Sequence, residues 1–140
     1  MLTLHVDTDS LARTASGSLT GVLFLRGDGG AFPDERWSDF PVVVLTWWLE
    51  ALDGLRAGRA PSASCRFMEG PFRVELTRRG AELLVRGQRT GRRVEVLLEE
   101  RADLETFWRE VRAVASRVVA ACAAHGWTSK DLEALRGALD

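Results

Sequence analysis

The sequence contains no Ile, no Asn and no Tyr, and a single lysine, Lys130, accompanies eighteen arginines. The codons of these scarce residues are AT-rich, so the bias is typical of a GC-rich bacterial genome. The abundance of arginine is therefore not in itself a sign of nucleic-acid binding. A net charge of −1 is also far from the positive excess that nucleic-acid binders usually show. We do not expect nucleic acid to be the main partner.

Long apolar segments are also missing. No apolar run approaches the ~18 residues that a membrane-spanning helix requires. The N-terminus, MLTLHVDTDS, has neither the basic region nor the continuous apolar segment of a signal peptide. We therefore expect a cytoplasmic protein that does not act at a membrane.

Cysteine is scarce as well, with only Cys65 and Cys122 in the chain. Two cysteines do not make the disulfide framework of a small secreted domain. Each lies in an apolar pattern, and free cysteine is among the most often buried residue types. We expect two reduced, buried thiols.

What is present is the composition of an ordinary globular domain, with 140 residues of which 46% are hydrophobic and 28% charged. This length fits one domain, residues 1–140. The elements below predict an α+β fold. It would have one antiparallel sheet of about five to six strands, two main helices packed on one face, and a short C-terminal helix.

Periodicity locates these elements. Alternation at 2–6, an apolar run at 19–27 and three or four short strands within 62–98 predict the sheet. Ser38 or Asp39 can cap a helix that has Pro41 in its first turn and ends at Gly54 or Gly58. A long amphipathic helix should begin near Asp103 and stop at Gly126. A capping signal at Thr128 then predicts the last helix.

Catalytic and cofactor motifs are weak throughout. His5 has no acid or nucleophile near it in sequence, and Cys122 with His125 makes at most half of a zinc site. GDGG lacks the Lys-Ser/Thr of a phosphate-binding loop and the spacing of a dinucleotide fingerprint. We predict no catalytic residue, no metal and no cofactor.

Charge is unevenly distributed, because residues 61–98 carry eight basic and four acidic side chains. These arginines could form a basic sheet face for RNA or phosphate, but the strands offer no aromatic stacking platform beside them. Glu75 and Glu95 could pair with arginines across strands. A salt-bridged, solvated face is the preferred interpretation, and a weak nucleic-acid or phosphate binder remains an alternative.

The segment FPDERWSDFP, residues 32–41, is the best candidate for a binding site, and we call it the entrance loop. Its acids cluster around one tryptophan, and two adjacent tryptophans follow on the predicted helix, where neighbours point about 100° apart. Trp is over-represented at interface hot spots. We predict a partner-binding site made of Asp34, Glu35, Trp37, Asp39 and Trp47. The alternative is that Trp37 covers a sheet edge and the acids only keep the loop solvated.

The order of segments FP…RWSDFPVVVLTWWLEAL, FMEGPF and HGW before a short final helix resembles small actinobacterial-type α+β proteins. In size and layout these are similar to the immunity proteins of bacterial polymorphic-toxin systems. The resemblance implies a non-enzymatic protein that binds another protein, such as a toxin domain, and inhibits it by occlusion. It transfers no site residue.

A second hypothesis is a homodimer, or another homo-oligomer, built on the outer face of the sheet. If the strand register is read correctly, that face would carry an apolar patch made of Val22, Phe24, Met68, Leu84 and Leu97.

Overall fold

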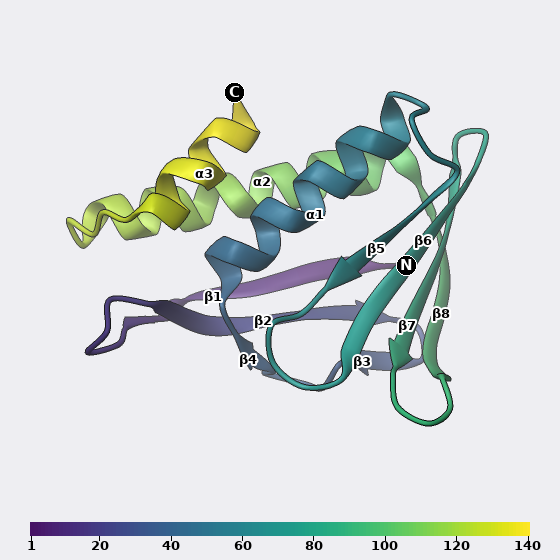
Figure 1. The fold of residues 1–140 in the computed structure, drawn as a ribbon, viewed down its shortest axis with the longest axis horizontal. Coiled ribbons are helices and arrows are strands. Elements are labelled where there is room, and N and C mark those ends of the chain that lie inside the picture. The colour runs from purple at the N-terminus through teal and green to yellow at the C-terminus, as the bar shows by residue number, and fades with distance from the viewer.

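The computed structural model describes all residues from 1 to 140 and has an α+β fold with eleven elements. Eight strands form two antiparallel four-stranded sheets, and three helices pack together over them (Figure 1). The helices are α1 (Pro41–Arg56), α2 (Leu104–Ala124) and α3 (Lys130–Leu139). None of them is long and apolar enough to cross a membrane.

The first sheet is built around one central strand. Its strands are β1 (Thr3–Arg13), β2 (Leu19–Gly27), β3 (Gly30–Phe32) and β4 (Ser38–Asp39). β2 pairs with β1 along one edge and with the two short strands, β3 and β4, along the other. This central place explains why β2 is apolar on both faces. Leu23 and Leu25 are fully buried, while Val22 and Phe24 on the opposite face are each 8% exposed.

The second sheet is a regular meander in the order β5-β6-β7-β8. Its strands are β5 (Ser62–Arg66), β6 (Phe72–Arg79), β7 (Glu82–Arg89) and β8 (Glu95–Asp103). Alternate residues such as Val74, Leu76, Leu83 and Val85 are buried, and the residues between them form a charged outer face. β5 and β8 are the two edge strands.

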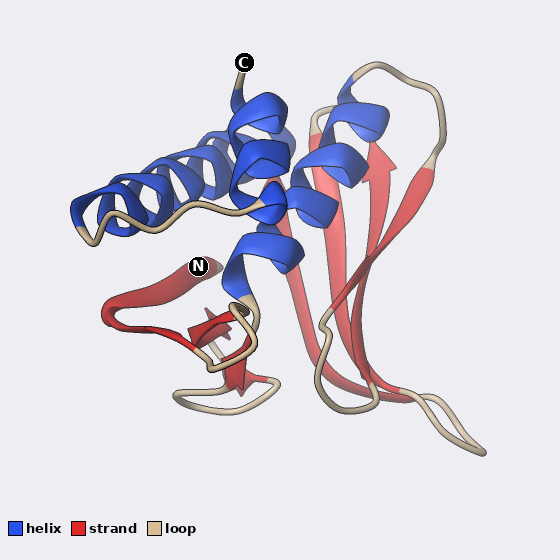
Figure 2. Ribbon diagram, turned by 60° about the vertical axis from the view of Figure 1, so that its left-hand side comes forward, coloured by secondary structure: helices blue, strands red, loops and turns tan.

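The helices cover the inner faces of both sheets and close one continuous core of thirty buried residues. α1 packs against β5 and β2, α2 lies along β1, and α3 rests on α1 and α2. Figure 2 shows the first sheet below the helices and the second sheet beside them, at an angle to the first. Helical spacing predicts two apolar stripes, and nearly all their members are buried: Leu45, Trp48, Leu49, Leu52 and Leu55 in α1, and Leu104, Phe107, Val111, Val114, Val118 and Cys122 in α2. Trp108, which shares the spacing of the second stripe, is only half-buried.

The predicted single sheet of five to six strands is wrong in its pairing, although the fold class and the strands of residues 62–98 are confirmed. Where the sheets meet, side chains replace ladder hydrogen bonds. The backbone N–H of Asp28 donates to the Glu100 carboxylate at 2.6 Å, and the Phe32 ring lies against Gly87. Hydrophobic alternation does not encode which strand edges pair, so the sequence left this open.

Helix ends were predicted within one or two residues. α2 stops in a Schellman motif, in which the Trp127 and Gly126 N–H groups donate to the carbonyls of Cys122 and Ala123. The cap of α3 is Ser129 rather than Thr128. The predicted cap of α1 is wrong, because Phe40 holds the N-cap position and has no side-chain cap, while Pro41 opens the helix as expected.

The contact between the sheets gives a stability test with a matched control. A Cβ at Gly87 would lie 2.8 Å from the ring of Phe32, which is buried and cannot move away. We expect Gly87→Ala to lower the free energy of unfolding by about 1–3 kcal/mol through overpacking.

Gly54 in α1 has nothing within 4 Å of an added Cβ. Gly54→Ala should therefore stabilise the protein by about 0.5–1 kcal/mol, since alanine is the better helix former. Urea unfolding followed by circular dichroism measures both. Equal effects of the two substitutions would show that the sheets do not meet at Gly87.

Candidate functional site

The carboxylate of Asp39 lies inside the protein and accepts four N–H groups. One oxygen accepts from the backbone of Phe40 at 2.7 Å and of Met68 at 3.1 Å. The other accepts from the Trp37 indole at 2.9 Å and from the backbone of Glu69 at 3.2 Å. Asp39 is 1% exposed, so its predicted role in meeting a partner is wrong. Burial of a carboxylate is tolerable here because charge-assisted hydrogen bonds replace its water.

Trp37 is half-buried and holds the entrance loop against the second sheet. Its ring packs edge-on against Phe72 of β6, with centroids 5.2 Å apart, and its backbone carbonyl accepts from Leu23 N–H of β2 at 2.8 Å. Gly70 lies under both rings, where an added Cβ would be 3.2 Å from Trp37. The alternative interpretation, in which Trp37 covers the edge of a sheet, agrees with this packing.

The remaining acids of the loop are exposed, but their carboxylates are engaged locally. Asp34 accepts from its neighbour Glu35 N–H at 2.8 Å, and the Glu35 carboxylate pairs with Arg26 of β2. Arg36 has a left-handed backbone, with φ of 54°, and its guanidinium donates to Asp7 of β1 at 3.0 Å. The Arg36 guanidinium, followed by the Asp9 N–H, lowers the pKa of Asp7 below its ordinary value. The entrance loop thus connects β1, β2 and the second sheet.

Trp47 is the member of the predicted site that stands free at the surface. Its neighbour Trp48 is 1% exposed and donates its indole N–H to the Arg66 carbonyl at 3.0 Å, whereas Trp47 is 40% exposed. The divergence of adjacent helix positions therefore separates one core tryptophan from one surface tryptophan, as the sequence predicted. The structure does not bring Trp47 together with the acids of the entrance loop into one site.

Two shallow hollows meet at Trp47. One, of about 250 Å³, lies between α1 and α3 and is lined by Val43, Thr46, Trp47, Glu50, Asp131 and Ala134. The other, of about 170 Å³, lies between Trp47 and the residues Ser64 and Arg66 of β5. A third hollow, of about 280 Å³, continues from Arg66 to Arg73 and Thr90 beyond it. We call these three hollows together the α1–β5 surface.

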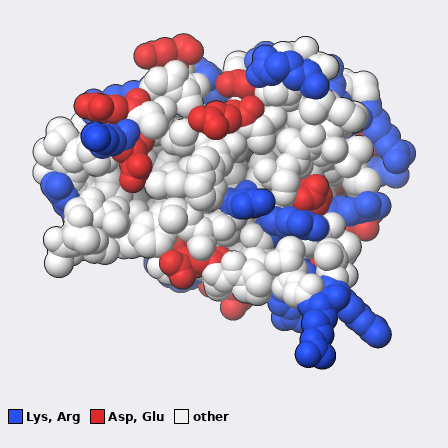
Figure 3. Space-filling view, viewed as in Figure 1, with Lys and Arg blue, Asp and Glu red and all other residues white.

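Three of the eight arginines within residues 61–98 form ion pairs, and the predicted pairing of Glu75 and Glu95 with arginines is among them. Arg73 lies 3.2 Å from Glu75, Arg86 lies 3.7 Å from Glu99, and the guanidinium of Arg89 donates to both oxygens of Glu95. Figure 3 shows basic side chains over the meander and at the tip of one hairpin, with acidic ones among them, beside a largely uncharged area over the first half of α1. Arg66 has no carboxylate within ion-pair distance.

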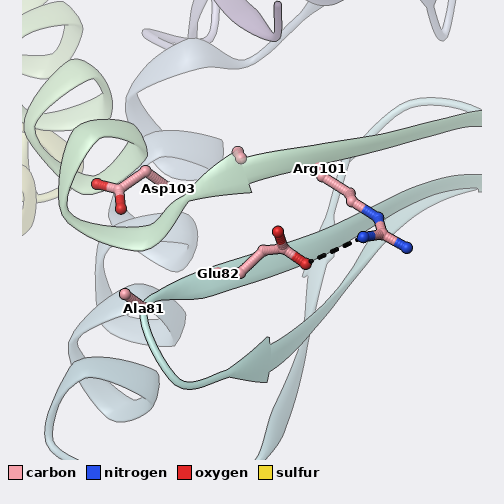
Figure 4. Close-up of a pocket in the computed structure, with 5 residues that line it drawn as sticks. Ala81, Glu82, Arg101 and Asp103 are labelled. Atoms are coloured by element: carbon pink, nitrogen blue, oxygen red, sulfur yellow. Dashed lines mark ion pairs between the residues drawn. The ribbon is translucent and has the colours of Figure 1, made fainter.

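A hollow at the start of β7 is lined by Ala81, Glu82, Arg101, Ala102 and Asp103 (Figure 4). Its charged groups are engaged with one another or with the helix. Arg101 and Glu82 pair across the strands at 3.6 Å, and Asp103 accepts from Thr106 N–H at 3.0 Å as the N-cap of α2. In Figure 4 Asp103 points away from the pair, so the three groups do not converge on one point.

The histidines and cysteines do not assemble. The structure contains no group of three or more His, Cys, Asp or Glu side chains that could hold a metal ion. His5 stacks on Phe24 with ring centroids 5.1 Å apart, and His125 stacks on Trp127 at 4.1 Å. Cys65 and Cys122 are free and buried. Burial, and then the charge of Glu75, raises the pKa of the Cys65 thiol, and burial raises that of Cys122.

The predicted apolar patch for a homodimer is not one surface. Val22 and Phe24 are buried in the first sheet, and Leu84 is half-buried in the second. Met68 and Leu97 are exposed, but they lie beside β5 and on β8, the opposite edges of the meander. The prediction failed because it assumed that all strands belong to one sheet.

Comparisons of this chain with protein-family models, with curated proteins and with solved structures find no match. In the sequence, Arg66 is one of the eight arginines within residues 61–98. The signal that distinguishes it is the hairpin CRFMEGPFRV, in which two arginines flank one turn at matched positions.

The Asp39 cluster predicts a large effect from an isosteric change. Asp39→Asn removes the charge and turns an amide N–H₂ toward donors, so we expect the free energy of unfolding to fall by about 2–4 kcal/mol. Asp34→Asn is the matched control, because Asp34 is exposed and accepts one local N–H. Chemical denaturation followed by tryptophan fluorescence measures both variants. Similar losses in the two would contradict the central place of Asp39.

The two thiols should be inert in the folded protein. Burial both blocks access and disfavours the thiolate that reacts. With a chromogenic disulfide reagent at pH 8, we expect no reaction in buffer and two thiols per chain after unfolding in guanidinium. Rapid labelling of either cysteine under native conditions would contradict this prediction.

Proposed function

We propose that this chain is a non-enzymatic protein-binding module that docks through the α1–β5 surface with Trp47 as its anchor. The observation that carries the proposal is the 40% exposure of Trp47 at the junction of two hollows. Burial of this exposed apolar surface against a partner would contribute favourable free energy to binding. Tryptophan is also enriched at hot spots, in pockets near the centre of an interface.

The strand beside Trp47 supports the same proposal. β5 pairs only with β6, so its other edge is open along the residues that line the hollow. An open edge offers backbone N–H and C=O groups to an incoming segment, and natural proteins usually protect such edges. Here one carbonyl, that of Arg66, is covered by the Trp48 indole. An exposed aromatic beside an open edge is an arrangement that suits a protein partner.

The narrower form of the proposal is an immunity-type inhibitor that occludes a bacterial toxin. It rests on the resemblance in size and layout and on the absence of a converging set of catalytic side chains in the hollows described above. In this form the captured partner would be a toxin domain, and co-expression of the chain would restore growth to cells that produce it.

A second candidate is self-association through β8. Val94, Val96 and Leu97 are all about half exposed near the start of this edge strand, which gives them a contiguous apolar stretch. A second copy that paired there would cover it. Light scattering at high concentration on the wild type and on Leu97→Arg separates the two candidates, since only self-association through β8 predicts a dimer that this substitution dissociates.

The main test uses Trp47 as a point of capture. A photoreactive phenylalanine analogue replaces Trp47 in the full chain and, as a matched control, Leu97, which is exposed to a similar degree on the other edge. In lysate of the source cell, we expect one stoichiometric protein to crosslink to position 47 and not to position 97. That protein is then purified, and its affinity is measured for the wild type, Trp47→Ala and Leu97→Ala.

We expect Trp47→Ala to weaken binding by about 2 kcal/mol or more, and Leu97→Ala to change it little. Circular dichroism verifies that each variant is folded. An unchanged affinity of Trp47→Ala for the purified partner, or the same protein captured from both positions, would refute Trp47 as the anchor.

A further inference from the structure

Two arginines face each other at one end of the α1–β5 surface. The register of the β5–β6 hairpin places Arg66 directly opposite Arg73. Like charges in directly opposed positions destabilise an antiparallel pair. On the same face the other opposed arginines are compensated, since Arg86 lies opposite Glu75 and Glu99, and Arg79 lies opposite Glu82. The Arg66–Arg73 pair is the exception on the outer face.

The carboxylate of Glu75, which lies near this pair, is already engaged. Glu75 lies 3.2 Å from Arg73 and also accepts the Ser64 hydroxyl at 2.6 Å. Arg73 in addition donates to the Gln88 side-chain oxygen at 2.9 Å. These contacts fix the Arg73 guanidinium in place, whereas Arg66 has no carboxylate partner. Only one of the two guanidinium groups therefore has a carboxylate partner, and the local excess of charge is positive.

The hollow between the two arginines has a rigid lining. It is formed by Arg66, Phe67, Gly70, Pro71, Phe72, Arg73 and Thr90. Phe72 is packed by Trp37, and Asp39 holds the N–H groups of Met68 and Glu69 at the start of the turn. The backbone N–H of Thr90 donates to the Pro71 carbonyl at 2.7 Å. A site whose walls are fixed before binding loses little conformational entropy when it is occupied.

The geometry points to an oxyanion site in which Arg66 and Arg73 bind a carboxylate side chain of the partner protein, while the Thr90 hydroxyl donates to the Pro71 carbonyl at 3.2 Å and forms part of the wall. This inference rests on the proposed function, because the same partner would cover Trp47 in the adjoining hollow. Guanidinium groups bind carboxylates through paired, charge-assisted hydrogen bonds, which is why arginine is preferred for this contact. The partner is therefore expected to present an acidic residue next to an apolar one.

A carboxylate fits this surface better than a nucleic acid does. Glu69 and Glu75 lie close to the arginine pair in the sequence, and Glu99 lies farther along the same outer face, opposite Arg86. A phosphate backbone that ran along the sheet would meet these acids, whereas one isolated carboxylate would not. At the opposite end of the surface, Glu50 and Asp131 line the hollow between α1 and α3. The partner should thus be acidic only where it contacts Arg66.

The test uses the full chain labelled with ¹⁵N and a blocked pentapeptide, Ac-Glu-Val-Glu-Val-Glu-NH₂, at low ionic strength. We expect saturable shifts in the amides of Ser64, Arg66 and Thr90. The uncharged peptide Ac-Gln-Val-Gln-Val-Gln-NH₂ should give none. No saturable shift with the acidic peptide at millimolar concentration overturns the proposal, and so does tighter binding of inorganic phosphate or of an eight-nucleotide oligothymidine at the same residues.

Arg66→Gln separates a binding role from a structural one. It relieves the opposed charges, so we expect the melting temperature to stay the same or rise while affinity for the acidic peptide falls about tenfold or more. Arg92→Gln is the control, because Arg92 is an exposed arginine of the β7–β8 hairpin with no ion-pair partner and the change in net charge is identical. Equal loss in both variants would indicate attraction by net charge alone and overturn the site. A lower melting temperature of Arg66→Gln would do the same.

The two proposals can fail separately. If the protein crosslinked at position 47 binds Trp47→Ala weakly but Arg66→Gln as tightly as the wild type, the docking surface stands and the carboxylate site is wrong. If the acidic peptide binds at Arg66 but no protein crosslinks from position 47, the proposed function is wrong, and with it the assignment of this carboxylate to a partner.

Discussion

The fold depends on one buried carboxylate. Asp39 collects N–H groups from three places that are distant in the chain or differ in structure: the indole of Trp37 in the entrance loop, the first backbone amide before α1, and the turn between β5 and β6. A buried charge is expensive unless it is fully hydrogen-bonded, and each oxygen here accepts two donors. Because no single element can supply these donors, Asp39 is satisfied only when the two sheets and α1 are assembled.

The hydrogen bonds of Asp39 also fix the packing of the aromatic side chains around it. Trp37 is held by Asp39 and covers Phe72, and the Phe32 ring at the start of the same loop packs against Phe72 and lies over Gly87. Two four-stranded sheets that share no ladder hydrogen bonds are thereby fixed to each other by side chains. The residues that the sequence predicted as a recognition loop largely serve to join the two sheets, so we place the proposed recognition at other positions.

The proposed docking surface is the one that the loop supports. Trp47 lies on the outer side of α1 because its neighbour Trp48 fills the core, and the two positions of a helix cannot both face inward. The turn fixed by Asp39 forms the wall of the hollow beside Arg66. Our proposal links stability and binding at this edge. The buried carboxylate orders the turn, and the ordered turn holds two like charges opposite each other. Such an arrangement lowers stability unless a ligand compensates it.

The sequence alone determined the local structure. Period-two and helical spacing located the meander and the buried stripes of α1 and α2, Pro41 and Gly126 marked helix ends, and the adjacent tryptophans implied one exposed ring. Only the tertiary structure decided that β1 to β4 form a separate sheet, that Asp39 is internal, and that Arg66 faces Arg73. These facts depend on which strand edges pair and on donors that lie some thirty residues away from their acceptor. Local structure can be predicted because propensity acts between residues that are neighbours in the sequence. Strand pairing and long-range hydrogen bonds are fixed only when distant segments pack into the same core.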